Sequence, residues 1–132
     1  MDWLKMLGTT ERQLQDDWRN KETRPTNCVT SRKRMSMRPG DRIALYATGQ
    51  GAVFAFGRVT SFAYPRPDPN DEGFEWCVNV DLGSNYREFL HEGVPLNLVS
   101  VDGRDLRKSI KQQSHIKLSP VEFDAIRRAL TV

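Results

Sequence analysis

Residues 42–62 read RIALYATGQGAVFAFGRVTSF, and this stretch decides the fold. Two runs rich in apolar residues, 42–47 and 52–62, flank the turn-forming sequence TGQG at 48–51. Valine, phenylalanine and tyrosine favour strands, and glycine adopts the backbone conformations that a tight turn requires. We therefore predict two adjacent strands joined by a glycine turn. Gly57, inside the second run, indicates a bulge or a close approach of another backbone.

Outward from this hairpin, two further strands are predicted at 75–81 and 96–101, where apolar residues recur in strand-like patterns. Residues 64–73 contain three prolines, which remove three backbone donors, so we expect an exposed loop there. Residues 85–91 match no single pattern. Residues 1–7 fit either a short strand or the first turn of a helix.

Helix signals lie at both ends of the chain. Ser119 as N-cap, Pro120 at the first position and Glu122 as the reciprocal cap predict a closing helix with a stripe of apolar residues through Leu130. The sequence Thr10-Glu11-Arg12-Gln13 also has the layout of a capping box, so a helix is predicted at 11–19 with Leu14 and Trp18 on one face. A short helical turn is predicted at 31–37, before Pro39 and Gly40.

The composition fits one compact α+β domain covering residues 1–132, with a small, strongly curved or closed sheet. Cys28 and Cys77 are too few and too far apart for a zinc ribbon or a disulfide framework, which indicates a reducing compartment. No run approaches the roughly 20 apolar residues that span a bilayer, and the first residues do not resemble a signal peptide. We expect a cytoplasmic protein with no membrane partner.

Catalytic and metal-binding patterns are not found. The two histidines, His91 and His115, stand in no metal-ligand spacing, and the sequence holds neither a nucleophile elbow nor a phosphate-binding loop of the P-loop type. Cys28 and His115 are more easily explained as structural residues. We therefore expect no enzyme activity, no metal and no cofactor.

A basic cluster is the clearest sign of a partner. The net charge is +3, and four cations fall within seven residues: Arg32, Lys33, Arg34 and Arg38. Such a segment is typical of phosphate contacts, and equally of a solvated helix face. Aromatic residues lie near turns and basic groups, as in proteins that stack on a flipped-out base, although aromatic residues also build the core of any small barrel.

The order and spacing of several short motifs resemble the EVE domain family. Asn27 is followed by a Met-x-x-Gly-Asp motif ending at Asp41, Tyr46-Ala47-Thr48-Gly49 resembles that family's strand ending in Tyr-His-Ser-Gly, and residues 53–67 and 114–130 resemble its following strand, its Tyr-Pro-x-Pro loop and its closing helix. The resemblance covers about residues 27–130. It implies a PUA-like β-barrel with flanking helices, related to YTH and ASCH domains, that reads modified bases such as 5-methylcytosine in DNA, or altered bases in RNA, through an aromatic-lined pocket.

This chain departs from the family pattern in the presumed pocket. Ala47 replaces the family's histidine, Cys28 replaces the aromatic residue that usually follows the asparagine, and the nearest preceding tryptophan is Trp18, nine residues before Asn27. These changes affect the ligand more than the fold, because other residues build the strands and the closing helix.

The resulting hypothesis is a nucleic-acid-binding module that recognises a modified nucleobase. The expected base pocket comprises Trp18, Asn27, Thr30, Ser31, Tyr46, Thr48, Tyr64 and Trp76. The expected phosphate contacts are Arg32, Lys33, Arg34 and Arg38. Two alternatives stay open: an ASCH-like hydrolase that acts on a modified nucleoside, and a protein-interaction module, such as the specificity part of a defence system, that uses the proline loop.

Overall fold

The computed structural model describes residues 1–9, 11–16, 18, 28–67, 73 and 75–131. Its elements are, in chain order, β1 (Asp2–Leu7), β2 (Cys28–Ser31), β3 (Arg42–Ala47), β4 (Ala52–Val59), β5 (Tyr64–Pro65), β6 (Trp76–Asp81), the 3-10 helix η1 (Leu90–Glu92), β7 (Val94–Pro95), α1 (Leu96–Val99), α2 (Leu106–Ser109), β8 (His115–Leu118) and α3 (Pro120–Leu130).

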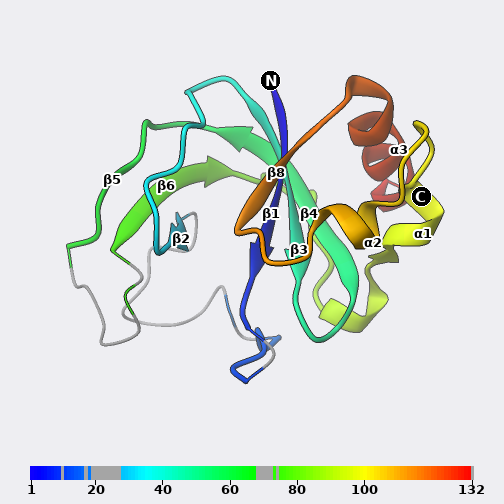
Figure 1. The fold of residues 1–132 in the computed structure, drawn as a ribbon, viewed down its shortest axis with the longest axis horizontal. Helices are drawn as coiled ribbons and strands as arrows, with labels where there is room; N and C mark the ends of the chain where they lie inside the picture. Colours follow the sequence, from blue (N-terminus) through cyan, green and yellow to red (C-terminus); the bar gives the residue numbers. More distant parts are fainter. Residues whose placement is uncertain (10, 17, 19–27, 68–72, 74, 132) are drawn as a thin grey trace.

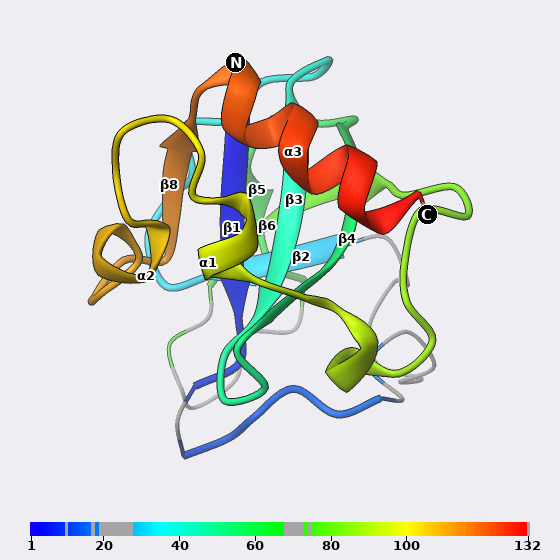
Figure 2. The same cartoon turned by 90° about the vertical axis from the view of Figure 1, so that its right-hand side faces the viewer.

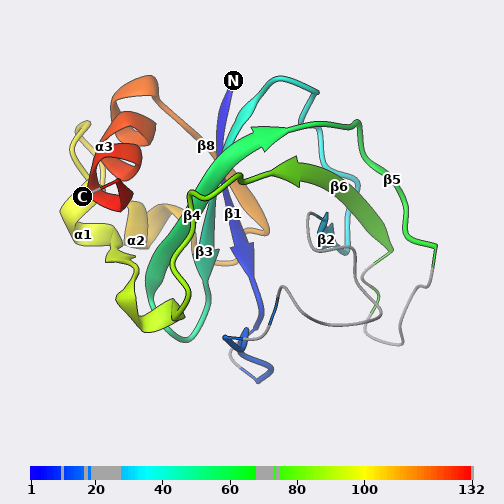
Figure 3. The ribbon, with the colours of Figure 1, turned by 180° about the vertical axis from the view of Figure 1, so that it is seen from behind.

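The strands of the described residues form one mixed sheet in the order β2-β6-β4-β3-β1-β8, with β5 paired to β6 and β7 paired to β4. Strands β1 and β3 are parallel, and every other pair is antiparallel. The sheet curls into a half-barrel, with helices α1, α2 and α3 on the side away from β2, β5 and β6 (Figures 1 and 3). The fold is α+β, with a small, strongly curved sheet and flanking helices, as predicted.

The predicted hairpin is confirmed as β3 and β4, which pair from Arg42 opposite Arg58 to Ala47 opposite Ala52. Gly49 and Gly51 in the turn have φ angles of +93° and +69°, a conformation that costs glycine little. Gly57 marks a close backbone approach: a Cβ there would lie 2.0 Å from the carbonyl oxygen of Asp81. The register shift of the hairpin lies elsewhere, between Leu45 and Tyr46.

Strands β1, β3 and β4 are buried on both faces. Trp3, Ile43 and Phe54 belong to one core cluster, whereas their chain neighbours Leu4, Ala44 and Val53 belong to a second. Helix α3 crosses one face of these strands (Figure 2) and adds Phe123 and Ile126 to the second cluster. Burial on both faces explains why these strands are almost continuously apolar instead of alternating. The ambiguity at residues 1–7 is resolved in favour of a strand, between β3 and β8.

Two predicted strands and the closing helix had different outcomes. Strand 75–81 is confirmed as β6, and helix α3 has the predicted capping box at Ser119 and Glu122. The strand predicted at 96–101 is wrong, because Leu96–Val99 is the short helix α1. Leu96 and Val99 are buried three residues apart, while Leu98 is exposed, which is helical spacing.

The helix predicted at 11–19 is wrong over residues 11–16 and 18, and its other positions lie outside the described residues. The Thr9 N–H donates to the Arg12 carbonyl, and the Arg12 N–H donates to the Thr9 hydroxyl, so a tight turn forms where the helix was expected. Leu14 and Trp18 are nevertheless buried in the first core cluster. Their burial, and not a helical backbone, explains the apolar spacing.

The helical turn predicted at 31–37 is also wrong, because the chain leaves β2 at Ser31 in a bend and then runs without helix to the turn at Pro39–Gly40. Met35 and Met37 are buried, while Arg34, Ser36 and Arg38 are exposed. Alternation with a period of two belongs to an extended chain.

The prediction of an exposed loop at 64–73 is partly wrong, because Tyr64 and Pro65 form strand β5 against β6. Proline is tolerated there because in the described residues β5 pairs with β6 alone, as an edge strand does. Residues 68–72 of the loop lie outside the described residues. Residues 85–91, for which no element was predicted, include an isolated bridge between Tyr86 and Ala55 and the start of η1.

Candidate functional site

A groove of about 760 Å³ lies at the uncovered edge of β1. Strand β8 pairs with β1 only as far as His115 opposite Lys5, and one further bond joins the Met6 N–H to the Ser114 carbonyl at 3.0 Å. Beyond this point the walls come from the end of β1, residues 31–34 after β2, the end of β3, and the segment between α2 and β8. The groove is large enough for a nucleotide-sized ligand.

The groove is strongly cationic. Among the described residues its lining contains no aspartate or glutamate and six basic side chains: Lys5, Arg32, Lys33, Arg34, Arg107 and Lys111. Arg107 is offset by Asp105, which lies outside the lining at 3.2 Å from the guanidinium. The walls therefore create a positive potential that attracts anions.

Lys5 differs from the other cations of the groove because its side chain is only 2% exposed. Its Nζ donates to the carbonyl oxygens of Met6 at 2.9 Å and Ser114 at 3.2 Å. No carboxylate of the described residues pairs with it. Burial lowers the pKa of Lys5 from 10.5 to about 8, because the charged form loses its hydration.

His115 is the immediate neighbour of Lys5 across the β1–β8 pair. Its Nδ1 lies 2.7 Å from the Ser114 hydroxyl, and its ring packs edge-on against Trp3 with the centroids 5.6 Å apart. Burial, and then the charge of Lys5, lower the pKa of His115 below its ordinary value of 6.5. The imidazole is therefore neutral at pH 7, and the groove has a neutral hydrogen-bonding group beside its buried ammonium.

Six of the residues singled out from the sequence lie in this groove: Ser31, Arg32, Lys33, Arg34, Tyr46 and Thr48. They lie at the ends of two strands that are not neighbours in the sheet, β2 and β3, or directly after these ends. Burial raises the pKa of Tyr46, so its hydroxyl stays neutral and can donate a hydrogen bond at neutral pH. The groove thus combines polar groups, one phenol ring and a cationic rim.

The other aromatic candidates occupy different places. Trp76 pairs with Ser31 in the β2–β6 register, and the Arg34 guanidinium lies 5.5 Å from the centre of its ring, so Trp76 borders the groove. Trp18 is 6% exposed and packs edge-on against Phe54, which makes it part of the core.

Thr30 and Tyr64 lie on the opposite face of β2, β5 and β6 from Ser31 and Trp76. Both stand opposite Cys77 in the strand registers, and successive residues of a strand point to opposite faces. Burial and the neighbouring cysteine thiols raise the pKa of Tyr64 to about 12. The structure therefore does not bring these two residues into the groove.

The structure does not place the last two candidates, Arg38 and Asn27, in the groove. Arg38 is exposed near the turn at Gly40, where its backbone N–H donates to the Asp41 carboxylate at 3.0 Å. Asn27 lies outside the described residues, directly before β2.

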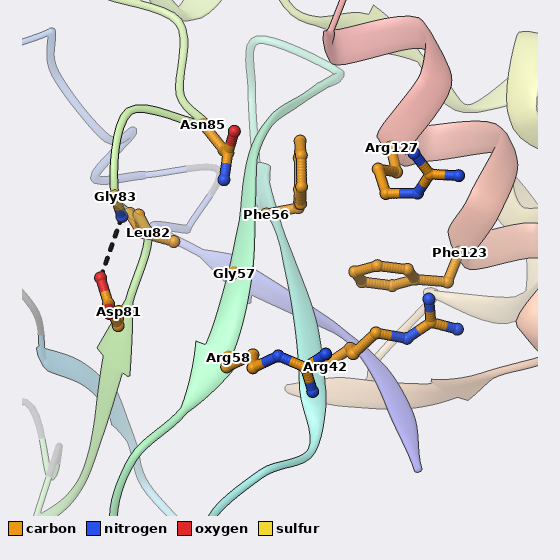
Figure 4. A pocket seen from close by; sticks show the side chains of 10 residues that line it. All are labelled: Arg42, Phe56, Gly57, Arg58, Asp81, Leu82, Gly83, Asn85, Phe123 and Arg127. Atoms are coloured by element: carbon orange, nitrogen blue, oxygen red, sulfur yellow. Dashed lines mark hydrogen bonds between the residues drawn. The ribbon is translucent and has the colours of Figure 1, made fainter.

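A second pocket, of about 340 Å³, lies between β4, the segment after β6, and α3 (Figure 4). The rings of Phe56 and Phe123 meet edge-on in it, with centroids 6.2 Å apart. Arg42 packs over Phe123 and pairs with Asp2 at 2.7 Å and Asp124 at 3.1 Å. Because these carboxylates neutralise Arg42, this pocket attracts anions less than the groove does.

Sequence reasoning missed the groove residues contributed by β1 and by the segment after α2. Arg107, Lys111 and His115 gave no local signal, because only the pairing of β8 with β1 brings them beside β2. Lys5 did carry a signal, because it is a lysine in the otherwise apolar run Trp3–Leu7. It is two residues from Trp3, so in a strand both side chains point to the same face. A cation at an inward strand position is rarely retained without a partner or a function.

In the described part of the chain, no three histidine, cysteine or acidic side chains are grouped as metal ligands. No helix there has the length and apolar character needed to cross a bilayer.

The buried charge of Lys5 has a measurable cost. We expect Lys5→Met to raise the free energy of unfolding by about 1–3 kcal/mol at pH 7, because a pKa of about 8 in the fold against 10.5 in the free side chain penalises the charged form. The destabilisation by the buried charge is largest below pH 8, shrinks between pH 8 and pH 10.5, and is absent above pH 10.5. Urea denaturation across this range tests it. A gain that does not shrink with pH, or an equal gain from the exposed Lys111→Met, would contradict the assignment.

Comparison with known proteins places the fold. No family model matches the sequence, and no curated protein is similar enough to count as a relative. The solved structures that share the fold include the following three. A Rhodopseudomonas palustris protein has 18% identity and a TM-score of 0.61, covering 98% of this chain and 92% of its own. An Agrobacterium tumefaciens protein has 16% identity and a TM-score of 0.63, covering 99% and 93%. Human THYN1, solved in complex with DNA that contains 5-methylcytosine, has 13% identity and a TM-score of 0.59, covering 99% and 98%.

Proposed function

We propose that this protein binds nucleic acid through the cationic groove and holds a modified base there. The observation that carries the proposal is the charge of the lining, with six basic side chains and no carboxylate among its described residues. Phosphates are the anions that such a surface binds most readily, by displacing their counterions. The exposed Arg32, Lys33 and Arg34 contact the backbone of the nucleic acid.

The base occupies the groove, which Ser31, Tyr46 and Thr48 line from different elements. The Tyr46 ring supplies a stacking surface, and the hydroxyl groups read the polar edge of the base, as in other sites that hold a flipped-out base. Trp76 borders this part of the groove beside Ser31. The proposal is supported by human THYN1, a protein of the same fold that was solved with DNA containing 5-methylcytosine.

The phosphate contacts are tested by salt dependence. We expect the triple variant Arg32→Gln, Lys33→Gln, Arg34→Gln to bind oligonucleotides more weakly and to lower the slope of log affinity against log salt by about 2 to 3, because each lost phosphate contact contributes about 0.7 to 0.9. Fluorescence anisotropy at two or more salt concentrations, with single- and double-stranded DNA and RNA, measures this. Arg38→Gln is the matched control, since it removes a cation of the same segment outside the groove. An unchanged slope in the triple variant would show that the segment does not contact phosphate.

Base recognition is tested at Tyr46. We expect Tyr46→Ala to lower the affinity for an oligonucleotide with a modified base by about 5- to 150-fold, because stacking contributes roughly 1–3 kcal/mol per base. Tyr46→Phe keeps the ring and should keep most of the affinity. The same panel with cytosine in place of 5-methylcytosine shows whether the modification is read. Equal affinities of Tyr46→Ala and the wild type for the modified probe would exclude this stacking site.

The second candidate function is hydrolysis of a modified nucleoside, and Lys5 is the observation that favours it. A general base works best when its pKa lies near the operating pH, and the pKa of Lys5 is about 8. If the groove is catalytic, a modified cytidine should be converted on incubation with the protein, as followed by chromatography, and Lys5→Met should abolish the conversion. If the protein binds oligonucleotides but does not convert the modified cytidine, base recognition without catalysis is the better account of the groove.

A further inference from the structure

Lys5 is the cation of the groove that the solvent does not screen. The other basic side chains of its described lining are exposed, whereas Lys5 is 2% exposed. A charge in bulk water interacts weakly with a ligand at a given distance, and the same charge away from water interacts several times more strongly. Lys5 therefore has the largest potential effect on an anion that enters the groove.

Within the described residues, no carboxylate serves as a counterion to the ammonium of Lys5. Its two acceptors are backbone carbonyls, which provide dipoles but no negative charge. Among the described residues, the other titratable and charged groups that line the same groove are His115 from β8, Tyr46 from β3, and the basic residues Arg32, Lys33, Arg34, Arg107 and Lys111. None of these groups carries a negative charge near neutral pH. A buried charge is normally paired, so the unpaired one marks a place for a ligand anion.

We propose that Lys5, with the neutral His115 and the Ser114 hydroxyl beside it, forms a buried subsite for one anionic oxygen group of the bound ligand. This inference rests on the proposed function and makes it more specific. The group is either a backbone phosphate or a carboxylate attached to the base. In both cases an N–H of Lys5 donates to the anion in a charge-assisted hydrogen bond, which is stronger than a neutral one.

Binding at this subsite is coupled to a proton. An anion beside Lys5 favours the charged ammonium, so the complex holds a proton that the free protein loses as the pH rises through about 8. His115 and Tyr46 do not compete in this range, because the pKa of His115 is lowered by burial and the pKa of Tyr46 is raised by it. The affinity for the ligand should therefore fall as the pH rises.

The experiment measures the affinity of wild type and Lys5→Met for oligonucleotides containing cytosine, 5-methylcytosine or 5-carboxylcytosine, at about pH 7 and about pH 9 and constant ionic strength. We expect the wild type to bind roughly tenfold more weakly at the higher pH, and Lys5→Met to bind weakly with no such dependence. Lys33→Met and Lys111→Met are the matched controls, which should keep the pH dependence. If the affinity of Lys5→Met also falls as the pH rises, the proposed subsite is wrong.

The three probes separate the two sources of the anion. If Lys5 contacts a phosphate, Lys5→Met weakens all three probes equally and lowers the salt slope by about 1. If Lys5 contacts a carboxylate on the base, Lys5→Met weakens only the 5-carboxylcytosine probe. Unchanged affinity for every probe would overturn the proposal.

A second measurement separates the subsite from the proposed function. NMR titration of the Lys5 side chain gives its pKa in the wild-type protein without and with inorganic phosphate. If phosphate raises the pKa of Lys5, the result supports the subsite. If in addition no oligonucleotide binds, the proposed nucleic-acid function is wrong but the subsite stands. A pKa that phosphate leaves unchanged, together with pH-independent oligonucleotide binding, rejects the subsite and leaves the nucleic-acid function standing.

Discussion

The structure depends on the burial of β1, β3 and β4 on both faces. Helix α3 adds Phe123 and Ile126 to the cluster on one face, and on the other face the curl of the sheet brings Val29 of β2 and Val78 of β6 into the same core cluster as Phe54. A flat sheet would leave more of that second face in water, at a cost of about 25 cal/mol for each Å² of apolar surface. The half-barrel is therefore the means by which a small chain protects three apolar strands.

The groove is a consequence of the same arrangement. Strand β8 pairs with only part of β1, so the end of β1 borders a space that residues 31–34 and the segment after α2 surround. The alternation that turns Trp3 and Leu7 toward the core also turns Lys5 inward. The protein thus has a buried cation at the place where its sheet edge is open, and the burial of this charge lowers stability.

The cations of the groove and of the second pocket differ in the partners that they contact. Arg42 in the second pocket has two carboxylate partners and an aromatic ring beneath it, so it fastens β3 to β1 and α3. Among the described residues, the partners of the Lys5 ammonium are two backbone carbonyls. Arg104 and the buried Glu122 form a further closed pair, at 2.8 Å, that fastens α3 to the segment before α2. The paired charges hold elements of the fold together, whereas Lys5 has no carboxylate partner in the described part of the chain.

The sequence by itself determined the elements whose signals are local: the β3–β4 hairpin, β6, and α3 with its capping box. It also identified the basic segment 32–34 and Tyr46. Only the tertiary structure decided that 96–99 is helical, that 11–16 and 31–37 are not, and that Tyr64 and Ser31 lie on opposite faces. Strand pairing between distant residues and burial in a shared core set these features, and neither is encoded within a short window. The same long-range pairing of β1 with β3 and β8 placed Lys5 in the lining of the groove.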